Sequence, residues 1–415
     1  MVFNFLHRNW VSGNPPVVQK TENPIRFGIL GAAKIAPSAL IVPARTHPDV
    51  EIYAVAARDR EKAETYAKQH GIPVVLDSYE ALLENPKVDA VYIALPNGLH
   101  LEWALKALRH GKHVLLEKPS VSNAEEAELL FNLPLLKEPN APILLEAVHY
   151  YFDPTWKYFM SQIRPADVVY ASHIALAPKG AIALTDIRYN HELSGGAIMD
   201  IGSYGISALR SIFASEPEEC TECETKTAGA PASHLCDSEY TAKLKFPNGG
   251  VGEIHGNYNS PWLKFRLPSI KVEHRETVVD DESLDPSHEK IVIRKVTFSG
   301  HMFATMHNRI DTEDNYQVRR KDNHQIIKKW TQKVQKGVHS FHEININEPG
   351  EVYWKSYRYQ LEQFVNKVRG RKADAAWVSA ENSLAQMKAV DMVYQKSGLG
   401  LRPTHTPLAV LANKV

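Results

Sequence analysis

The sequence predicts a doubly wound α/β domain followed by an α+β domain with an open, largely antiparallel sheet. In the first third of the chain, short apolar runs alternate with helical patterns, which favours a parallel sheet with helical crossovers. After Tyr150 this alternation stops, and longer runs with a two-residue period follow, as is typical of antiparallel strands. The chain has 415 residues, 44% of them apolar, which is enough for two hydrophobic cores.

The first domain is expected over residues 25–148, after an N-terminal arm over residues 1–24. Its strands are predicted at five apolar runs: Arg26 to Gly31, Val50 to Ala57, Val88 to Leu95, His113 to Leu116 and Pro142 to Val148. Between the third and fourth runs, Leu101 to Leu108 has the spacing of an amphipathic helix, and Gly111 ends it. Asn123 followed by Glu126 is a capping signal for another helix.

The turn after the first strand fits a dinucleotide-binding fingerprint, with Gly31, Ala33 and Ala36 at its three small positions. Such a turn offers the free N–H groups of a helix N-terminus to a pyrophosphate. Small residues that only allow close packing of helix on strand are the alternative. The candidate cofactor contacts in this turn are Gly31, Ala33, Lys34 and Ile35.

The second strand ends with Ala56-Ala57-Arg58-Asp59. A guanidinium at this place can grip a 2′-phosphate through paired, charge-assisted hydrogen bonds. We therefore predict NADP rather than NAD as the cofactor, with Arg58 as the residue that selects it. A surface arginine at the start of the next helix is the alternative.

Two further segments contain candidate catalytic residues. Glu117-Lys118-Pro119 follows an apolar strand, and ligands bind at the carboxyl ends of the strands in such sheets. A second segment begins with Gly195-Gly196 and continues as an apolar helical run that contains Asp200 and Tyr204. Residues four apart share a helix face, so this carboxylate and this phenol are expected together. A buried structural hydrogen bond between them is the alternative.

The second domain is expected over residues 149–399, before a C-terminal tail over residues 400–415. Strands are predicted at Asp167 to Ala175, at Lys290 to Phe298 and on both sides of a hairpin turn at Pro247 to Gly250. Helices are predicted at Tyr353 to Val368 and Ser379 to Lys396. An antiparallel sheet with helices on only one face leaves an apolar face to bury, and we therefore expect a homodimer.

Together, the first turn, Glu117-Lys118-Pro119 and the Asp200-x-Gly202-x-Tyr204 segment resemble the Gfo/Idh/MocA oxidoreductase family, from Ile25 to about Leu399. The resemblance implies a Rossmann domain and a substrate-binding and dimerisation domain. Ala56 to Asp59 and Asp186-Ile187-Arg188-Tyr189 are most similar to the branch of NADP-dependent D-xylose 1-dehydrogenases and dihydrodiol dehydrogenases.

The resemblance also implies roles for single residues. Lys118 lies near the nicotinamide and the reacting hydroxyl, Tyr204 is the acid/base, and Asp200 orients the sugar or the catalytic pair. Substrate-binding residues are Lys118, Arg188, Asp200 and Tyr204. The cofactor side is lined by Pro96, Asn97, His100, Glu117 and Lys118.

A free phenol, with a pKa of about 10, is a poor base at neutral pH. We expect the ammonium of Lys118 to lower the pKa of Tyr204, and the sequence leaves open which of the two carries the proton.

Two segments depart from the family pattern. Many relatives read E-A-F-M-Y-R-F-H-P where this chain has Glu146-Ala147-Val148-His149-Tyr150-Tyr151-Phe152-Asp153-Pro154, so the arginine and the histidine of that pattern are missing. The basic segment from Arg319 to Gly350 is longer than the family core needs. We expect a solvated insertion or lid edge there rather than a nucleic-acid site.

These observations predict an NADP-dependent oxidoreductase that oxidises a hydroxyl of an aldose, with D-xylose to xylonolactone favoured, or of a cyclic trans-diol. A second enzymatic hypothesis is that the same residues reduce a dicarbonyl compound. The alternative from another class is a non-catalytic, NADP-binding transcriptional regulator of the same fold.

The composition limits which binding partners and which cellular compartment are expected. Lysine plus arginine and aspartate plus glutamate number 48 each, so no net field favours nucleic acid or a membrane. Cys220, Cys223 and Cys236 with His234 lack the usual spacing of a zinc site and are expected as free thiols of a cytoplasmic protein. The apolar residues of the N-terminal arm, Phe3, Phe5, Leu6 and Trp10, are expected to dock on another surface.

Overall fold

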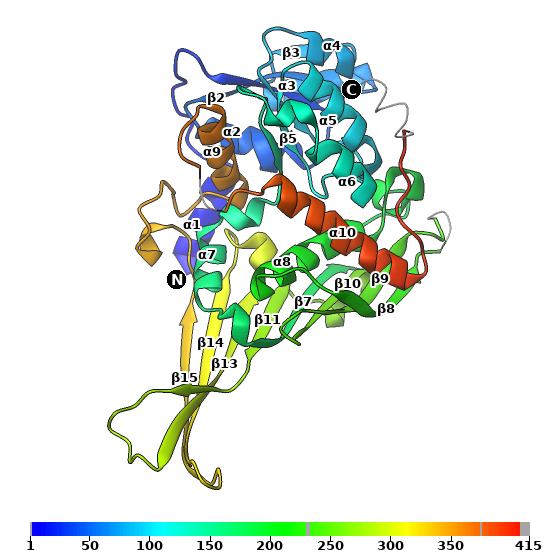
Figure 1. The fold of residues 1–415 in the computed structure, drawn as a ribbon. Helices are drawn as coiled ribbons and strands as arrows, with labels where there is room; N and C mark the ends of the chain where they lie inside the picture. Colours follow the sequence, from blue (N-terminus) through cyan, green and yellow to red (C-terminus); the bar gives the residue numbers. More distant parts are fainter. Residues whose placement is uncertain (1, 230–232, 374–375, 407–415) are drawn as a thin grey trace.

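The computed structural model describes residues 2–229, 233–373 and 376–406, and it contains two sheets with helices packed between them (Figure 1). The first sheet is parallel throughout, with the strand order β3-β2-β1-β4-β5-β6, as the alternating pattern predicts. Its strands are β1 Ile25–Leu30, β2 Val50–Ala56, β3 Val74–Leu76, β4 Ala90–Ile93, β5 His113–Leu116 and β6 Leu144–Glu146. The sequence did not predict β3, because this edge strand has only three residues and is half-buried.

Helices connect these strands. They are the helical segment Pro37–Ile41 continued by α2 Val42–Arg45, then α3 Arg60–His70, α4 Tyr79–Glu84, α5 His100–Arg109 and α6 Ala124–Phe131. The predicted cap is confirmed, since the side chain of Asn123 accepts a hydrogen bond from the N–H of Glu126 at 3.0 Å. Gly71 ends α3 with φ +70°, a left-handed conformation that glycine adopts without strain.

The second sheet is mixed and mostly antiparallel, with the order β15-β14-β13-β11-β7-β10-β9-β8 and with β12 beside β13. Only β7 and β10 run parallel among the described pairs. The strands are β7 Val168–Pro178, β8 Glu219–Thr227, β9 Asp237–Lys245, β10 Val251–Ser260, β11 Ser269–His274, β12 Thr277–Val279, β13 His288–Ser299, β14 Arg309–Arg320 and β15 Ile326–Lys336. The two-domain fold class and the β9–β10 hairpin are confirmed.

The expectation that the basic segment from Arg319 to Gly350 is an insertion is wrong in part. Residues from Arg319 onward complete β14 and form β15, which together extend the sheet to a protruding edge (Figure 1). The residues of β15 are exposed almost throughout. Because neither face of β15 is buried, its sequence lacks the alternation by which strands are predicted.

Helices α8 Ser203–Phe213 and α10 Ala380–Ser397 cover one face of the second sheet (Figure 1). Helix α7 Pro154–Ser161 follows the last strand of the first sheet. Although α9 Ser356–Val368 comes late in the chain, it packs on the first domain, where Phe364 contacts Phe27 with ring centroids 5.6 Å apart. Arg358 of α9 also donates to Thr46 at 2.9 Å. The two late helices therefore join the two sheets.

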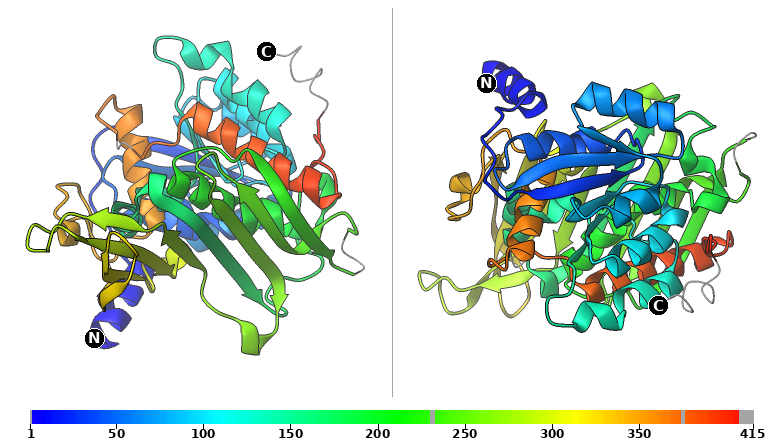
Figure 2. Two further views of the ribbon diagram at one scale, coloured as in Figure 1. Left: turned by 60° about the horizontal axis from the view of Figure 1, so that its bottom comes forward. Right: turned by 90° about the horizontal axis from the view of Figure 1, so that it is seen from above.

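Within the described residues, no helix covers the opposite face of the second sheet (Figure 2, left). Apart from Val251, the half-buried residues that point to this face from β9 and β10 are polar: Glu239, Thr241, Lys243, Glu253, His255 and Asn257. Contacts such as Thr241 to His255 at 2.9 Å and Asn257 to Glu239 at 2.9 Å join them. The expectation of an apolar face is therefore wrong for these strands, and the homodimer stays a prediction.

The N-terminal arm begins with a helix, α1 Val2–Gly13, at the side of the molecule (Figure 2). Arg8 joins it to the backbone carbonyl of Thr305 at 3.0 Å. Phe5, Leu6 and Trp10 are 40%, 59% and 65% exposed, so the expected docking of these side chains is not found within the chain. The side chain of Phe3 lies outside the described residues.

Cys220 and Cys223 lie in β8, and burial raises the pKa of these thiols to about 11 and about 12. Within the described part of the chain, no group of three or more potential ligands could hold a metal ion. None of the described helices is long and apolar enough to cross a membrane.

Candidate active site

The candidate site lies at the carboxyl ends of β1, β4 and β5, three adjacent inner strands of the parallel sheet. The strand order reverses between β1 and β4, and a doubly wound sheet binds its ligand at this point. The loops that follow these strands contain Gly31, Pro96 and Lys118. The topology thus brings three separately predicted segments to one edge.

Lys118 reaches from this edge to the second domain. Its Nζ donates to the Oδ1 of Asp200 at 2.8 Å and to the backbone carbonyl of the same residue at 3.0 Å. The peptide bond between Lys118 and Pro119 is cis. An ion pair between Lys118 and Asp200 therefore joins the two domains.

Asp200 is held on its other side as well. Its Oδ2 accepts from Nε of Arg188 at 2.7 Å and from the hydroxyl of Tyr258 at 3.0 Å. Burial alone would raise the pKa of Asp200, but the charges of Lys118 and Arg188 lower it well below its ordinary value. Asp200 is thus an anion held between two cations. Tyr258, which donates a hydrogen bond to it, was not predicted as a site residue from the sequence.

Tyr204 lies beside Lys118 and is 7% exposed. The Lys118 Nζ lies 4.6 Å from the centroid of its ring, as in a cation–π contact. Burial, followed by the negative charges of Glu117 and Asp200, raises the pKa of Tyr204 well above its ordinary value. The expectation that Lys118 lowers this pKa is wrong for this arrangement, because the ammonium lies over the ring and is paired with Asp200.

The segment that places Asp200 and Tyr204 is not a regular α-helix. Ile198–Gly202 forms a π-helical turn that continues directly into α8. Such turns are frequent at functional sites, and the sequence pattern did not reveal this one. Buried Asp237 fixes its start by accepting from the N–H of Ile198 at 2.6 Å. The wide turn allows Asp200 to face Lys118 while Tyr204 faces the loop after β6.

His149, in that loop, is a contact that the sequence analysis missed. Its Nε2 lies 2.9 Å from the Tyr204 hydroxyl, and its Nδ1 lies 2.7 Å from the hydroxyl of Ser356. His149 is 3% exposed, and burial, followed by the charge of Lys118, lowers its pKa to about 3. Its place just after β6, at the carboxyl edge of the sheet, is the signal that could have revealed it.

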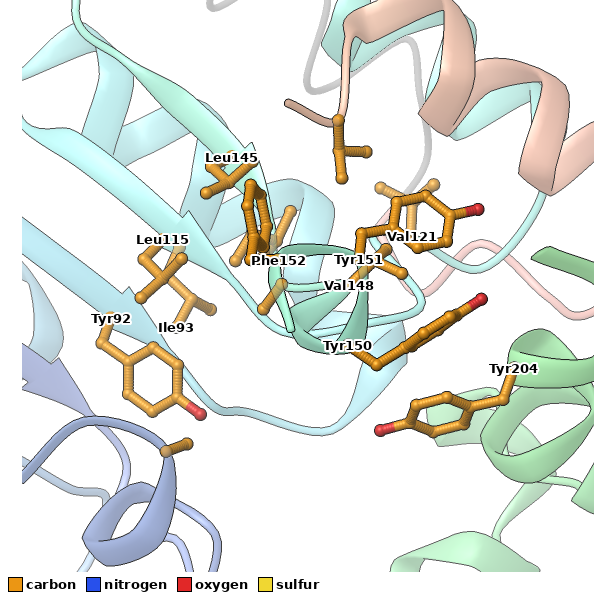
Figure 3. Packing of buried hydrophobic residues seen from close by; sticks show 14 of the residues in the cluster. Tyr92, Ile93, Leu115, Val121, Leu145, Val148, Tyr150, Tyr151, Phe152 and Tyr204 are labelled. Atoms are coloured by element: carbon orange, nitrogen blue, oxygen red, sulfur yellow. The ribbon is translucent and has the colours of Figure 1, made fainter. Parts of the chain in front are cut away.

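Aromatic side chains of the same loop support the site (Figure 3). The ring of Tyr150 lies 5.8 Å from that of Tyr204, while Phe152 packs toward Leu115 and Leu145 of the parallel sheet (Figure 3). The Tyr150 hydroxyl forms a 2.7 Å hydrogen bond with Ser207 of α8. This packing fixes the distance between the phenol of Tyr204 and the sheet edge.

Three residues assigned to the cofactor side form other contacts. His100 is fully buried, and its ring nitrogens face the backbone carbonyls of Leu95 and Pro119 at 2.8 and 3.0 Å. His100 therefore joins the two loops, and its assignment to the lining of the cofactor site is wrong. Buried Glu117 accepts from the hydroxyl of Tyr92 at 2.5 Å.

Asn97 donates to the carbonyl of Ser194 at 3.1 Å and so connects the loop after β4 to the second domain. Contacts of Pro96, Asn97 and Glu117 with a cofactor remain predictions.

The turn after β1 fits the dinucleotide that the fingerprint predicts. Gly31 has φ +95°, which favours glycine, and an added Cβ would lie 3.0 Å from the side chain of Leu95. Arg58 follows β2 with an exposed side chain, whereas its neighbour Arg60 is paired with Glu64 and Asp77. Asp59 caps α3 by accepting from Lys62 at 3.0 Å. Arg58 is thus a cation available for a phosphate near the end of β2.

Two family models match the chain. A model of an oxidoreductase family with an NAD-binding Rossmann fold, Gfo/Idh/MocA, matches residues 25–134, and a model of the C-terminal domain of this family matches residues 168–273. A D-xylose 1-dehydrogenase (NADP(+)) of Haloferax volcanii is 34% identical over 245 residues, which cover 58% of this chain and 71% of that protein. The chain belongs to the Gfo/Idh/MocA oxidoreductase family.

Another relative has a similar sequence identity to this chain. A trans-1,2-dihydrobenzene-1,2-diol dehydrogenase of Xenopus tropicalis is 31% identical over 199 residues, 47% of this chain and 59% of that protein. Among solved structures, a 3-ketoreductase from Actinomadura kijaniata in complex with NADP and TDP-benzene has a TM-score of 0.64 at 22% identity, covering 90% of this chain and 98% of that one. This last similarity confirms the two-domain fold.

Proposed function

We propose that the protein is an NADP-dependent oxidoreductase that oxidises a hydroxyl of an aldose or of a cyclic trans-diol by hydride transfer. Oxidation of D-xylose to xylonolactone is the favoured reaction. The single observation that carries the proposal is the cluster of Lys118, Asp200 and Tyr204 at the carboxyl edge of the Rossmann sheet. The family and the names of its relatives, which include a D-xylose and a diol dehydrogenase, support it.

Each residue has a role that follows from its contacts. Lys118, held by a carboxylate, is a donor that polarises the substrate oxygen, so that negative charge on this oxygen is stabilised. Tyr204 is the acid/base for the proton of the substrate hydroxyl, because its own hydroxyl is hydrogen-bonded to His149 within the site. Asp200, itself bound by Arg188, holds Lys118 in place, and both residues offer polar atoms to a polyhydroxylated substrate.

The bound nicotinamide supplies the acceptor for the hydride. The turn at Gly31 would hold its pyrophosphate, and Arg58 would bind the 2′-phosphate that distinguishes NADP from NAD. If Arg58 selects NADP, Arg58→Ala weakens NADP binding and leaves NAD binding nearly unchanged in a calorimetric titration. The matched control is Arg60→Ala, because Arg60 is already paired with Glu64 and Asp77.

The test is a panel of D-xylose, other aldoses and cyclic diols, each mixed with the purified protein and NADP or NAD. The absorbance of the reduced cofactor reports the reaction. Turnover of one panel member with NADP supports the proposal and identifies the substrate. Tight NADP binding without turnover of any member would contradict it and would favour a sensor.

A further inference from the structure

We propose that His149 is a proton relay that connects the Tyr204 hydroxyl, through Ser356, to solvent. The inference rests on the proposed function and adds to it the route by which the substrate proton leaves the buried site.

The geometry forms a continuous path. The Tyr204 hydroxyl lies 2.9 Å from Nε2 of His149, and Nδ1 of His149 lies 2.7 Å from Oγ of Ser356. Tyr204 and His149 are buried, whereas Ser356, at the first turn of α9, is half-exposed. The three groups therefore lead from the interior to the surface in two hydrogen bonds of ordinary length.

The packing of His149 holds it in this orientation. Its ring lies against the ring of Tyr357, with centroids 4.1 Å apart, and meets the Tyr204 ring nearly edge-on at 5.7 Å. A neutral imidazole has one donor and one acceptor nitrogen. With Nδ1–H directed at Ser356, Nε2 accepts from Tyr204, which is the tautomer that a relay from Tyr204 requires.

The proton balance is complete in the oxidative direction. The substrate hydroxyl gives its proton to Tyr204 as the hydride leaves carbon, and Tyr204 passes its own proton to Nε2 of His149. The Nδ1 proton moves to Ser356, and the Ser356 proton goes to water. Because His149 gains a proton at one nitrogen as it loses one at the other, no buried imidazolium accumulates beside Lys118.

The alternative is that His149 only holds the Tyr204 ring in place, and glutamine separates the two roles. His149→Gln can still accept from Tyr204 and donate to Ser356, but an amide does not relay protons at neutral pH. Ser356→Ala removes the outer group only; Ser356 does not serve as the cap of α9. The control is Ser211→Ala, which removes a hydroxyl bonded to Tyr151 at 2.9 Å, outside the path.

Kinetics with the substrate identified by the panel give the first readout. A relay predicts that His149→Gln lowers kcat about 100-fold with KM unchanged, and that the residual kcat rises with pH. Ser356→Ala is expected to lower kcat about 10-fold, and Ser211→Ala to leave it within about twofold. If kcat of His149→Gln stays within about threefold of the wild-type value, the relay is refuted.

Nitrogen NMR of histidine-labelled protein without cofactor gives the second readout, independent of activity. The His149 resonances, assigned from their loss in His149→Gln, are expected to show protonated Nδ1, with an Nε2 shift that changes in Tyr204→Phe. A protonated Nε2 would overturn the relay, since this nitrogen could not accept from Tyr204. Wild-type protein without turnover would instead refute the proposed function, whereas active wild type with an equally active His149→Gln refutes the relay alone.

Discussion

The contacts of one lysine determine what chemistry the site can perform. Lys118 donates to Asp200, and Asp200 is also bound by Arg188 and Tyr258. An ammonium held by a carboxylate is a hydrogen-bond donor, so Lys118 suits the stabilisation of a developing alkoxide better than the removal of a proton. The pKa of Tyr204, raised mainly by burial, makes its hydroxyl a group that passes a proton on rather than a standing phenolate.

Removal of either group is expected to abolish most turnover. Lys118→Met and Tyr204→Phe should each lower kcat at least about 100-fold, the usual contribution of a positioned acid/base or charged donor. NADP affinity, measured by calorimetry, should remain within about threefold, since the pyrophosphate and 2′-phosphate contacts lie elsewhere. Near wild-type activity in either variant would exclude that residue from the mechanism.

Asp200→Asn tests the positioning of Lys118. The amide leaves two cations facing each other without an anion, so we expect a loss of stability on the order of 3 kcal/mol and a lower kcat. The folded pKa of Asp200 is depressed, so its contribution is present above the unfolded value of about 3.9 and is lost only as the pH falls below it. Urea unfolding should therefore show the same deficit at pH 6 and pH 8. A deficit that differs between these two pH values would contradict the assignment.

At the scale of elements, the π-helical turn Ile198–Gly202 decides the direction of Asp200 and Tyr204. Gly196 precedes it with φ +135°, and an added Cβ would meet the side chains of Asp237 and Tyr394. Asp237 in turn bonds the N–H of Ile198 and the hydroxyl of Tyr394. The glycine thus allows a close approach on which the site depends.

Gly196→Ala is expected to destabilise the protein by more than about 2 kcal/mol, because a clash adds to the backbone strain. The matched control is Gly71→Ala, where φ is +70° and no atom lies within 4 Å of the added Cβ, so that only strain of about 1 kcal/mol applies. Chemical denaturation of both variants checks the difference. Equal losses would show that the contact of Gly196 with Asp237 and Tyr394 does not matter.

The sequence predicted the elements that bury one face or alternate clearly, and it missed those that do not. The strand over His113–Leu116 was predicted to the residue, since all four residues are apolar or aromatic and helices flank them. Strand β15 was not predicted because it is exposed on both faces. The π-helical turn was not predicted because a single wide turn leaves no periodic pattern in the sequence. Of the site, Lys118, Asp200 and Tyr204 follow from motifs, whereas His149, Tyr258 and Tyr357 become neighbours only through tertiary packing.

For the whole molecule, buried histidines set the response to acid. Burial lowers the pKa of His47, His149 and His301 to about 3, whereas unfolded histidine has a pKa of about 6.5. Their neutral forms contribute full stability above about pH 6.5, and this contribution is lost as the pH falls toward 3. Burial raises the pKa of six described carboxyl groups, which acts in the opposite direction. They are fewer than the ten described histidines whose pKa is lowered.

We therefore expect the free energy of unfolding to fall as the pH is lowered from 7 to 5. His301→Gln should reduce this slope by up to about 1.4 kcal/mol per pH unit, the contribution of one proton. Urea titrations of both proteins across this range provide the measurement. A slope that is the same in both would show that His301 also titrates normally in the folded state.

The predicted homodimer also belongs to this scale. The uncovered face of the second sheet carries charged and polar side chains on β9 and β10, so an interface there would depend on ion pairs and hydrogen bonds. Sedimentation velocity at micromolar concentration is expected to show a dimer that weakens with added salt. A monomer at low salt would contradict the prediction.

The central claim is that Lys118 and Tyr204 catalyse hydride transfer to NADP. A single-turnover reaction of the NADP-saturated wild-type protein with D-xylose deuterated at C1, compared with Lys118→Met, tests it most directly. The claim predicts a reduced-cofactor signal in the wild type, slowed by deuterium, and almost none in the variant at equal NADP occupancy. If D-xylose gives no signal, the same comparison is made with the panel member that does. Equal signals in wild type and variant, or NADP binding without transfer from any panel member, would contradict the claim.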